Sequence, residues 1–162
     1  MDILEAKSRV AEALVESIFR RARYGVRPFS PDAVAARFPR KDLSPDFVAA
    51  TAANGHPAAE VLVEVKYRPS IEQFLSVENQ RGERSLFEMT RRQWPDLYFV
   101  LVSDRPESGR SCFQAVAMQG IGPGGPFRST DLDQLSELNI FRSNLEDHEV
   151  LARRIFGLLA TA

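Results

Sequence analysis

Residues 45–67 read PDFVAATAANGHPAAEVLVEVKY and predict a β-hairpin at the centre of the fold. Residues 46–51 have the apolar character of a strand, and the Asn-Gly pair at positions 54 and 55 is a common hairpin turn. The returning strand, residues 59–67, alternates valines with charged residues, and successive strand residues point to opposite faces of a sheet. We therefore expect the valines to share one face, with Glu64 and Lys66 side by side on the other.

The sequence before the hairpin predicts a helix, an edge strand and a short second helix. Apolar residues recur at helical spacing from Ile3 to about Arg23, as in an amphipathic helix. Residues 26–29 predict a short strand, at an edge because Pro28 has no N–H to give to a neighbour. Ser30-Pro31 is typical of a helix start and predicts a short helix to Arg37.

The sequence after the hairpin predicts two capped helices, two strands and two further helices. Ser70 and Ser85 each stand three residues before a Gln or Glu, a pattern that predicts a helix start at both serines. Strands are expected over 97–102, buried on both faces, and 112–118, and helices over 131–138 and 145–159. The last helix is expected to turn Val150, Leu151, Ile155, Phe156, Leu158 and Leu159 to the core and His148 to the surface.

This order of elements predicts an α/β fold, a mixed central sheet flanked by helices, with residues 1–162 as a single domain. The chain has 44% hydrophobic and 27% charged residues and a net charge of −1, which argues against a histone-like protein coated with basic side chains. It has neither a signal peptide pattern nor a stretch that could span a membrane. Its single cysteine, Cys112, fits a reducing cytoplasm.

The charged residues of the hairpin suggest a divalent-metal site. An acid at the start of one strand, with an acid and a lysine two positions apart on the next, can bring three ionisable groups to one edge of the sheet. Mg²⁺ prefers hard oxygen ligands and keeps several waters, so a few carboxylates and a substrate phosphate suffice to hold it. Such an ion stabilises developing negative charge and activates a bound water, and a neighbouring lysine can orient that water.

The pair Pro45-Asp46, followed eighteen positions after Asp46 by Glu64-Val65-Lys66, resembles the PD…(D/E)XK signature of the restriction endonuclease-like nucleases. The expected elements from Ile3 to Val102 are similar to the αβββαβ core of that superfamily. The resemblance implies a metal-dependent nuclease that hydrolyses phosphodiester bonds in DNA, with Mg²⁺ or Mn²⁺ as its ion. It also implies that Asp46 and Glu64 bind the metal and that Lys66 acts on the water or the leaving charge.

The resemblance further implies a glutamate on the first helix, seven residues before a large apolar residue. Glu12 matches this position with respect to Phe19, although Arg23-Tyr24 stands where relatives have a glycine and an aromatic residue. Glu16 is the second choice, since it lies about 40° further round the helix, towards solvent. Glu12 and Glu16 therefore join Asp46 and Glu64 as candidate metal ligands.

A second interpretation is an inactive nuclease fold that serves as a protein-interaction module. The intact set of Asp46, Glu64 and Lys66 argues against it, because a site that has lost its function usually loses one of its members. The sequence contains no separate recognition domain, so we expect DNA to be found by backbone contacts, by a homodimer or through a partner protein.

Overall fold

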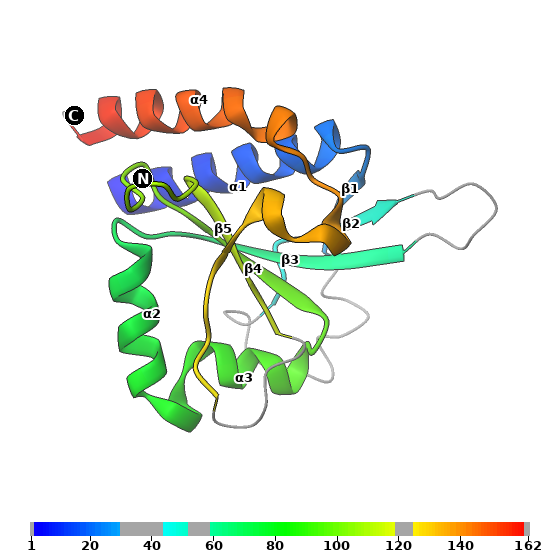
Figure 1. Ribbon diagram of the computed structural model, residues 1–162, viewed down its shortest axis with the longest axis vertical. Helices are drawn as coiled ribbons and strands as arrows, with labels where there is room; N and C mark the ends of the chain where they lie inside the picture. Colours follow the sequence, from blue (N-terminus) through cyan, green and yellow to red (C-terminus); the bar gives the residue numbers. More distant parts are fainter. Residues whose placement is uncertain (1, 30–43, 52–58, 119–124, 161–162) are drawn as a thin grey trace.

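The computed structural model describes residues 2–29, 44–51, 59–118 and 125–160, and this part of the chain forms an α/β fold around one mixed sheet (Figure 1). Its elements in chain order are α1 (Ile3–Arg21), β1 (Gly25–Pro28), β2 (Phe47–Thr51), β3 (Ala59–Tyr67), α2 (Ile71–Gln80), the 3₁₀ helix η3 (Gly82–Arg84), α3 (Leu86–Gln93), β4 (Leu97–Val102), β5 (Phe113–Ala117), β6 (Thr130–Asp131), the 3₁₀ helices η4 (Leu132–Gln134) and η5 (Ser136–Leu138), and α4 (Arg142–Ala160).

The six strands lie in the order β1-β2-β3-β4-β5-β6. All neighbouring pairs are antiparallel except β3 and β4, which are parallel. Parallel strands need a long crossover, and here the chain makes it through α2 and α3. The predicted mixed sheet and the edge position of β1 are thus confirmed.

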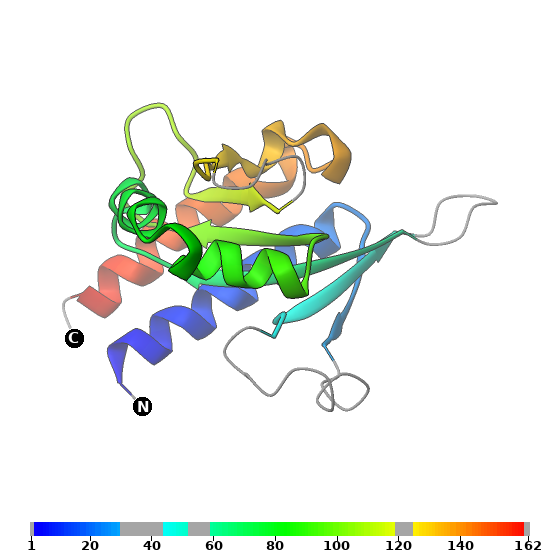
Figure 2. The ribbon, with the colours of Figure 1, turned by 90° about the horizontal axis from the view of Figure 1, so that it is seen from below.

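Helices cover both faces of the sheet, as the two perpendicular views show (Figures 1 and 2). Residues of α1 and α4 pack on one face with Val63, Val65 and Tyr67 of β3. Residues of α2 and α3 pack on the other face with Phe99 and Leu101 of β4. Alternate residues of β4 enter the two clusters, which explains the uninterrupted apolar run of this strand.

The helix starts predicted at the two serines are confirmed. The hydroxyl oxygen of Ser70 accepts from the N–H of Gln73 at 3.2 Å, and that of Ser85 accepts from the N–H of Phe87 at 3.0 Å. Each bond satisfies a backbone donor that has no partner within its helix. The first helix ends at Arg21, two residues before the predicted end, and Arg23 adopts a left-handed conformation with φ 75° where the chain turns towards β1.

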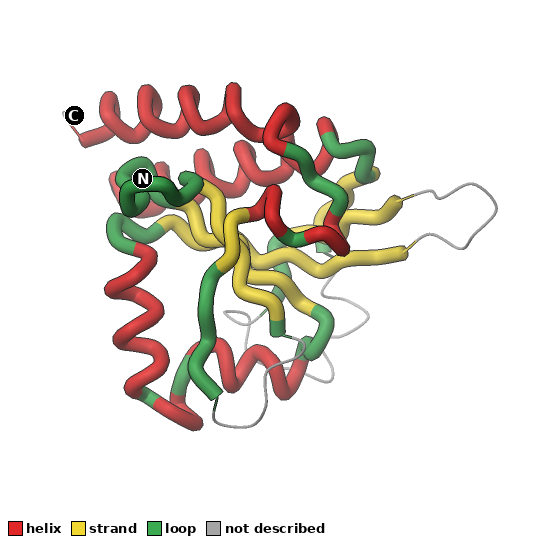
Figure 3. The backbone as a smooth tube through the Cα atoms, viewed as in Figure 1, coloured by secondary structure: helices red, strands yellow, loops and turns green. Residues whose placement is uncertain are grey.

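The helix predicted over residues 131–138 is confirmed only in part, because the chain forms two short 3₁₀ helices there and its first residue belongs to a strand. Thr130 and Asp131 form a short strand against β5, and η4 and η5 follow it (Figure 3). Asp131 is held there because its Oδ1 accepts from Arg110 Nε at 3.0 Å and from the N–H of Ser111 at 3.2 Å. These partners lie 20 and 21 residues away in the chain, so local spacing could not reveal them.

The predicted core face of the last helix is also wrong in part. Val150, Leu151 and Leu158 are exposed, and Leu158 keeps 72% of its surface, whereas Phe156 is fully buried. The buried face includes two polar residues that find partners: His148 Nε2 lies 2.8 Å from Ser17 Oγ on α1, and Glu149 accepts from the hydroxyl of Ser111. The expectation that His148 is a surface residue is therefore wrong.

Three predicted features lie outside the described residues: the short helix after Ser30, the Asn54-Gly55 turn and most of the glycine-rich segment before Gly125. Within the described ranges, none of the helices combines the length and the apolar character that crossing a membrane requires.

Candidate active site

Asp46 is held beside the middle of β3 by two main-chain hydrogen bonds. It immediately precedes β2, and its own N–H donates to the carbonyl oxygen of Val63 at 2.9 Å. Its carboxylate oxygen Oδ2 accepts from the N–H of Val65 at 2.7 Å. The antiparallel register that pairs Phe47 with Val63 brings the start of β2 to this point. Asp46 therefore flanks the strand segment that carries Glu64.

Glu64 and Lys66 are neighbours on one face of β3, as alternation predicted. Lys66 Nζ lies 3.4 Å from Glu64 Oε1, and their side chains keep only 19% and 11% of their surfaces exposed. The second oxygen, Glu64 Oε2, is buried and has no hydrogen-bond partner among the described residues. A buried carboxylate oxygen without a donor is a position that a cation or an ordered water can satisfy.

The helix α1 adds two carboxyl groups to this cluster. Burial first, and then the charges of Asp46 and Glu16, together raise the pKa of Glu12 to about 7, against the opposing charge of Arg9. Burial also raises the pKa of Asp46, and the charge of Glu16 adds to that effect. The N–H of Val65 and the charge of Lys66 oppose it. The structure thus brings both predicted helix glutamates within electrostatic range of Asp46, because α1 packs directly against β3.

Glu64 interacts with Asp46, Glu12 and Lys66. Burial, the largest effect, and the charges of Asp46 and Glu12 together raise its pKa to about 8. Lys66 opposes the shift through its charge and its hydrogen bond. Four carboxyl groups and one ammonium group leave an excess of negative charge in a half-buried place. In the absence of a cation, Glu12 and Glu64 therefore keep their protons to higher pH than ordinary glutamates do.

The chemistry of this donor set suits a hard divalent cation. Asp46 and Glu64 supply carboxylate oxygens, and Mg²⁺ is commonly held by one or two carboxylates together with waters and substrate phosphates. Among the residues that the structure describes, no group of three or more His, Cys, Asp or Glu side chains is arranged to hold an ion.

Sequence reasoning missed two features of the site. The N–H of Val65 fixes the Asp46 carboxylate, and no side-chain pattern signals a main-chain donor. Tyr67 anchors the opposite face of β3, where its ring stacks on Phe156 at 4.6 Å and its hydroxyl donates to Asp104 Oδ1 at 2.7 Å. The alternation of residues 64 and 66 does extend to Arg68, whose position on the same face could have been predicted.

The chain matches no family model, no curated protein and no solved structure. Its function is therefore inferred from its own geometry.

Proposed function

We propose that the chain is a metal-dependent nuclease with a restriction endonuclease-like fold, which hydrolyses phosphodiester bonds in DNA with Mg²⁺ or Mn²⁺. The order of α1, β1 to β3, the helical crossover and β4 supports the αβββαβ core. The observation that carries the proposal is the fixed position of Asp46, whose carboxylate is bonded to Val65 between Glu64 and Lys66. Asp46 precedes β2, and Glu64 and Lys66 follow it by 18 and 20 positions near the end of β3, so the three residues form one group at the open end of the hairpin.

In this proposal Asp46 and Glu64 hold the cation, and Glu12 or Glu16 adds an auxiliary carboxylate. A bound divalent ion neutralises charge on the phosphate and lowers the pKa of a coordinated water. Lys66, held at 3.4 Å by Glu64 Oε1, donates hydrogen bonds to the attacking water or to the developing charge. Hydrolysis forms a bond between the water oxygen and phosphorus and breaks the bond to one sugar oxygen. The leaving oxygen takes up a proton from the solvent or from an acid of the site.

We propose that the enzyme acts in the cytoplasm. The lone cysteine, Cys112, is buried and fits a reducing cytoplasm. In this proposal the enzyme finds DNA through phosphate contacts, a second copy of itself or a partner protein.

The test compares the wild type with Asp46→Asn and Lys66→Ala on single-stranded, duplex and branched DNA in Mg²⁺ or Mn²⁺. Asp46→Asn is preferable to alanine because an amide oxygen still accepts from the N–H of Val65 while the charge is lost. Both variants should lose cleavage by a factor of about 100 or more, because each removes charge that acts in the transition state. Thermal unfolding should show a metal-induced rise in Tm that Asp46→Asn abolishes and Lys66→Ala keeps.

Asp147→Ala is the matched control, since Asp147 is an exposed acid on α4, ion-paired with Arg21 and distant from the cluster in the chain. It should leave cleavage and the metal response unchanged. A wild type that shows neither metal-induced stabilisation nor cleavage would favour the inactive interaction module. Cleavage that survives in Asp46→Asn would assign the activity to another site or to a contaminant.

A further inference from the structure

A groove with a volume of about 450 Å³ runs along one side of α2, starting where β3 ends. The α2 residues that line it occur every three or four positions from Ser70 to Arg81, so they form one stripe along the whole helix. Arg68 closes the groove at the strand end. Figure 1 shows that α2 leaves the sheet directly from the end of β3. The groove therefore begins next to the strand that carries Glu64 and Lys66.

Arg68 is fixed in an orientation that leaves most of its donors free for a ligand. Its guanidinium carbon lies 4.5 Å from the centre of the Phe74 ring, and its Nη1 donates to the carbonyl oxygen of Tyr67 at 2.7 Å. A guanidinium group has five N–H donors in a planar fork that matches a phosphate group. Within the described part of the chain, this one bond and the ring contact hold it in place, and it lines the groove.

Glu78, the acidic residue that lines the groove, already has partners for both of its carboxylate oxygens. Glu78 is buried, its Oε1 lies 3.0 Å from Arg81 Nη1, and its Oε2 accepts from the N–H of Leu86 at 2.8 Å. Arg81 itself is exposed and has further donors for a ligand. Two arginines against one paired glutamate leave the groove with net positive charge, and the exposed amide of Gln73 adds a neutral donor. This combination suits a phosphodiester.

The position of Arg68 relative to the candidate active site indicates which phosphates of the substrate strand the groove would bind. Residues 64, 66 and 68 alternate along one side of the strand, and the N–H of Arg68 extends the ladder by donating to Val102 at 2.9 Å. Successive residues on one side of a strand are about 6.6–6.8 Å apart. That step is comparable to the spacing of neighbouring phosphates in a nucleic-acid strand. A strand cleaved at Lys66 would place its next phosphate at Arg68.

We propose that this groove binds the backbone of the substrate strand beyond the cleavage point, with Arg68 on the neighbouring phosphate and Arg81 on a further one. The proposal rests on the nuclease function above and adds the direction in which the strand leaves the site. It makes the groove a sequence-independent contact, because phosphate contacts position a nucleic acid without reading its bases.

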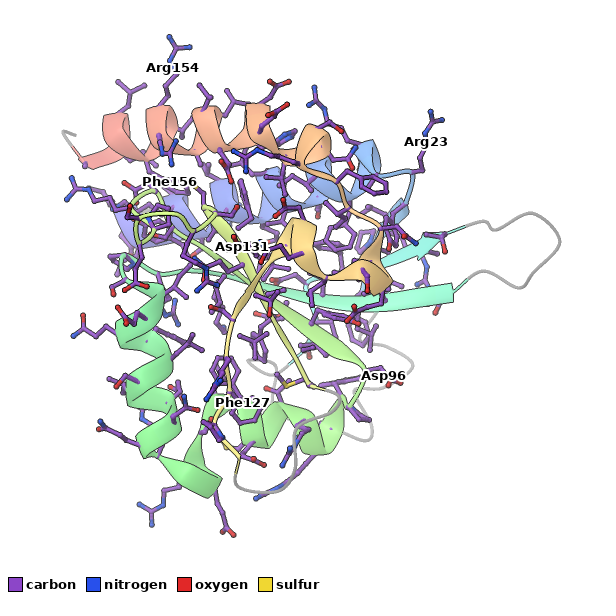
Figure 4. The ribbon with its side chains drawn as sticks, in the orientation of Figure 1. Arg23, Asp96, Phe127, Asp131, Arg154 and Phe156 are labelled. Atoms are coloured by element: carbon purple, nitrogen blue, oxygen red, sulfur yellow. The ribbon has the colours of Figure 1, made fainter. Side chains whose placement is uncertain are left out.

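The experiment measures binding of a fluorescently labelled oligodeoxynucleotide, single-stranded and duplex, by anisotropy in EDTA at several salt concentrations. Arg68→Ala and Arg81→Ala should each weaken binding about tenfold, because hydrogen bonds to charged groups are the stronger ones. Each should also lower the slope of log K against log salt by about 0.7–0.9, the value for one lost phosphate contact. Arg154→Ala is the matched control, since Arg154 is exposed and points away from the body of the molecule (Figure 4).

The outcomes separate this inference from the proposed nuclease function. Urea unfolding shows whether each variant is still folded. If Arg68→Ala is destabilised, the binding measurement on Arg81→Ala alone tests the inference. If both variants bind like Arg154→Ala while the wild type cuts DNA in Mg²⁺, the groove inference is overturned and the nuclease stands. If both variants bind weakly but the wild type never cuts, the groove binds DNA and the catalytic proposal fails. A wild type that neither binds nor cuts DNA overturns both.

Discussion

Glu64 is buried, lies next to a lysine and is within electrostatic range of the carboxyl groups of Asp46 and Glu12. Its Oε1 is paired with Lys66, while its Oε2 has no hydrogen-bond partner among the described residues. A buried carboxylate oxygen without a hydrogen bond lowers the stability of the metal-free protein. That cost is the structural reason to look for a cation, and it makes the pH dependence of the metal-free protein informative.

We predict that the free energy of unfolding of the metal-free protein falls as pH rises from about 4.5 to about 8. Glu64 has a pKa of about 8 in the folded protein and an ordinary value of 4.5 when unfolded. Between these values the folded state holds a proton that the unfolded state has released, so raising the pH favours unfolding. Above pH 8 Glu64 is ionised in both states, and its contribution no longer changes. Glu12, with a pKa of about 7, contributes with the same sign.

Urea unfolding in EDTA at several pH values, compared between wild type and Glu64→Gln, checks this prediction. The variant should be more stable than the wild type at pH 8 by about 1 kcal/mol or more, since one pKa unit corresponds to about 1.4 kcal/mol. Burial lowers the pKa of His148, so this residue destabilises the folded state at acid pH. Its effect is the same in both proteins and cancels when their free energies of unfolding are subtracted. Equal pH slopes in the two proteins would show that Glu64 is not the titrating group.

At the level of single elements, the N-cap of α3 is a stabilising feature that the sequence revealed. Ser85 is almost fully buried and accepts from the N–H of Phe87 at 3.0 Å. We predict that Ser85→Ala lowers the free energy of unfolding by about 1 kcal/mol, because the orphaned N–H loses its acceptor. Ser76→Ala, on the exposed side of α2, is the control and should be neutral or slightly stabilising. Urea unfolding of both variants is the measurement, and equal midpoints would contradict the role of the cap.

The elements that could be predicted from the sequence are those specified by nearby residues. The caps at Ser70 and Ser85 lie within three residues of their partners. The alternation that placed Glu64 beside Lys66 joins residues only two positions apart. Asp46 was placed near them because a hairpin joins adjacent strands, and the register of β2 on β3 agrees. Local chemistry was sufficient for these features, including the main group of the candidate site.

The features that were predicted wrongly depend on distant partners. Thr130 and Asp131 form a strand because β5 and Arg110 hold them, in a segment whose own spacing favours a helix. His148 is buried where α4 packs on α1, and its ring forms a hydrogen bond with Ser17, 131 residues away in the chain. Arg68 was overlooked for a related reason, since its stacking on Phe74 becomes visible only once α2 is packed against the end of β3.

Across the whole molecule, α4 connects the C-terminal end of the chain to the strand that carries the candidate site. It packs on α1, and Phe156 reaches the sheet, where its ring stacks on Tyr67 of β3 (Figure 4). Tyr67 is next to Lys66 in the chain and points to the opposite face. Helix packing at the C-terminus therefore supports the back of the strand whose front carries Glu64 and Lys66.

We predict that Phe156→Ala lowers the free energy of unfolding by about 3–5 kcal/mol, since it removes a fully buried ring and leaves a cavity against Tyr67. Leu158→Ala, two residues further along the same helix, is the matched control. Leu158 keeps 72% of its surface exposed, so its truncation should change stability by less than about 0.5 kcal/mol. Urea unfolding of both variants measures the difference.

This pair of variants tests the orientation of α4, because the apolar pattern of the sequence placed both residues in the core. If Leu158→Ala were as costly as Phe156→Ala, α4 would be rotated about its axis relative to the described packing, and His148 and Glu149 would lose their buried partners. If Phe156→Ala were harmless, the back of β3 would not depend on α4. A large loss for Phe156→Ala alone would support the described orientation of α4, with the Phe156 ring packed behind β3.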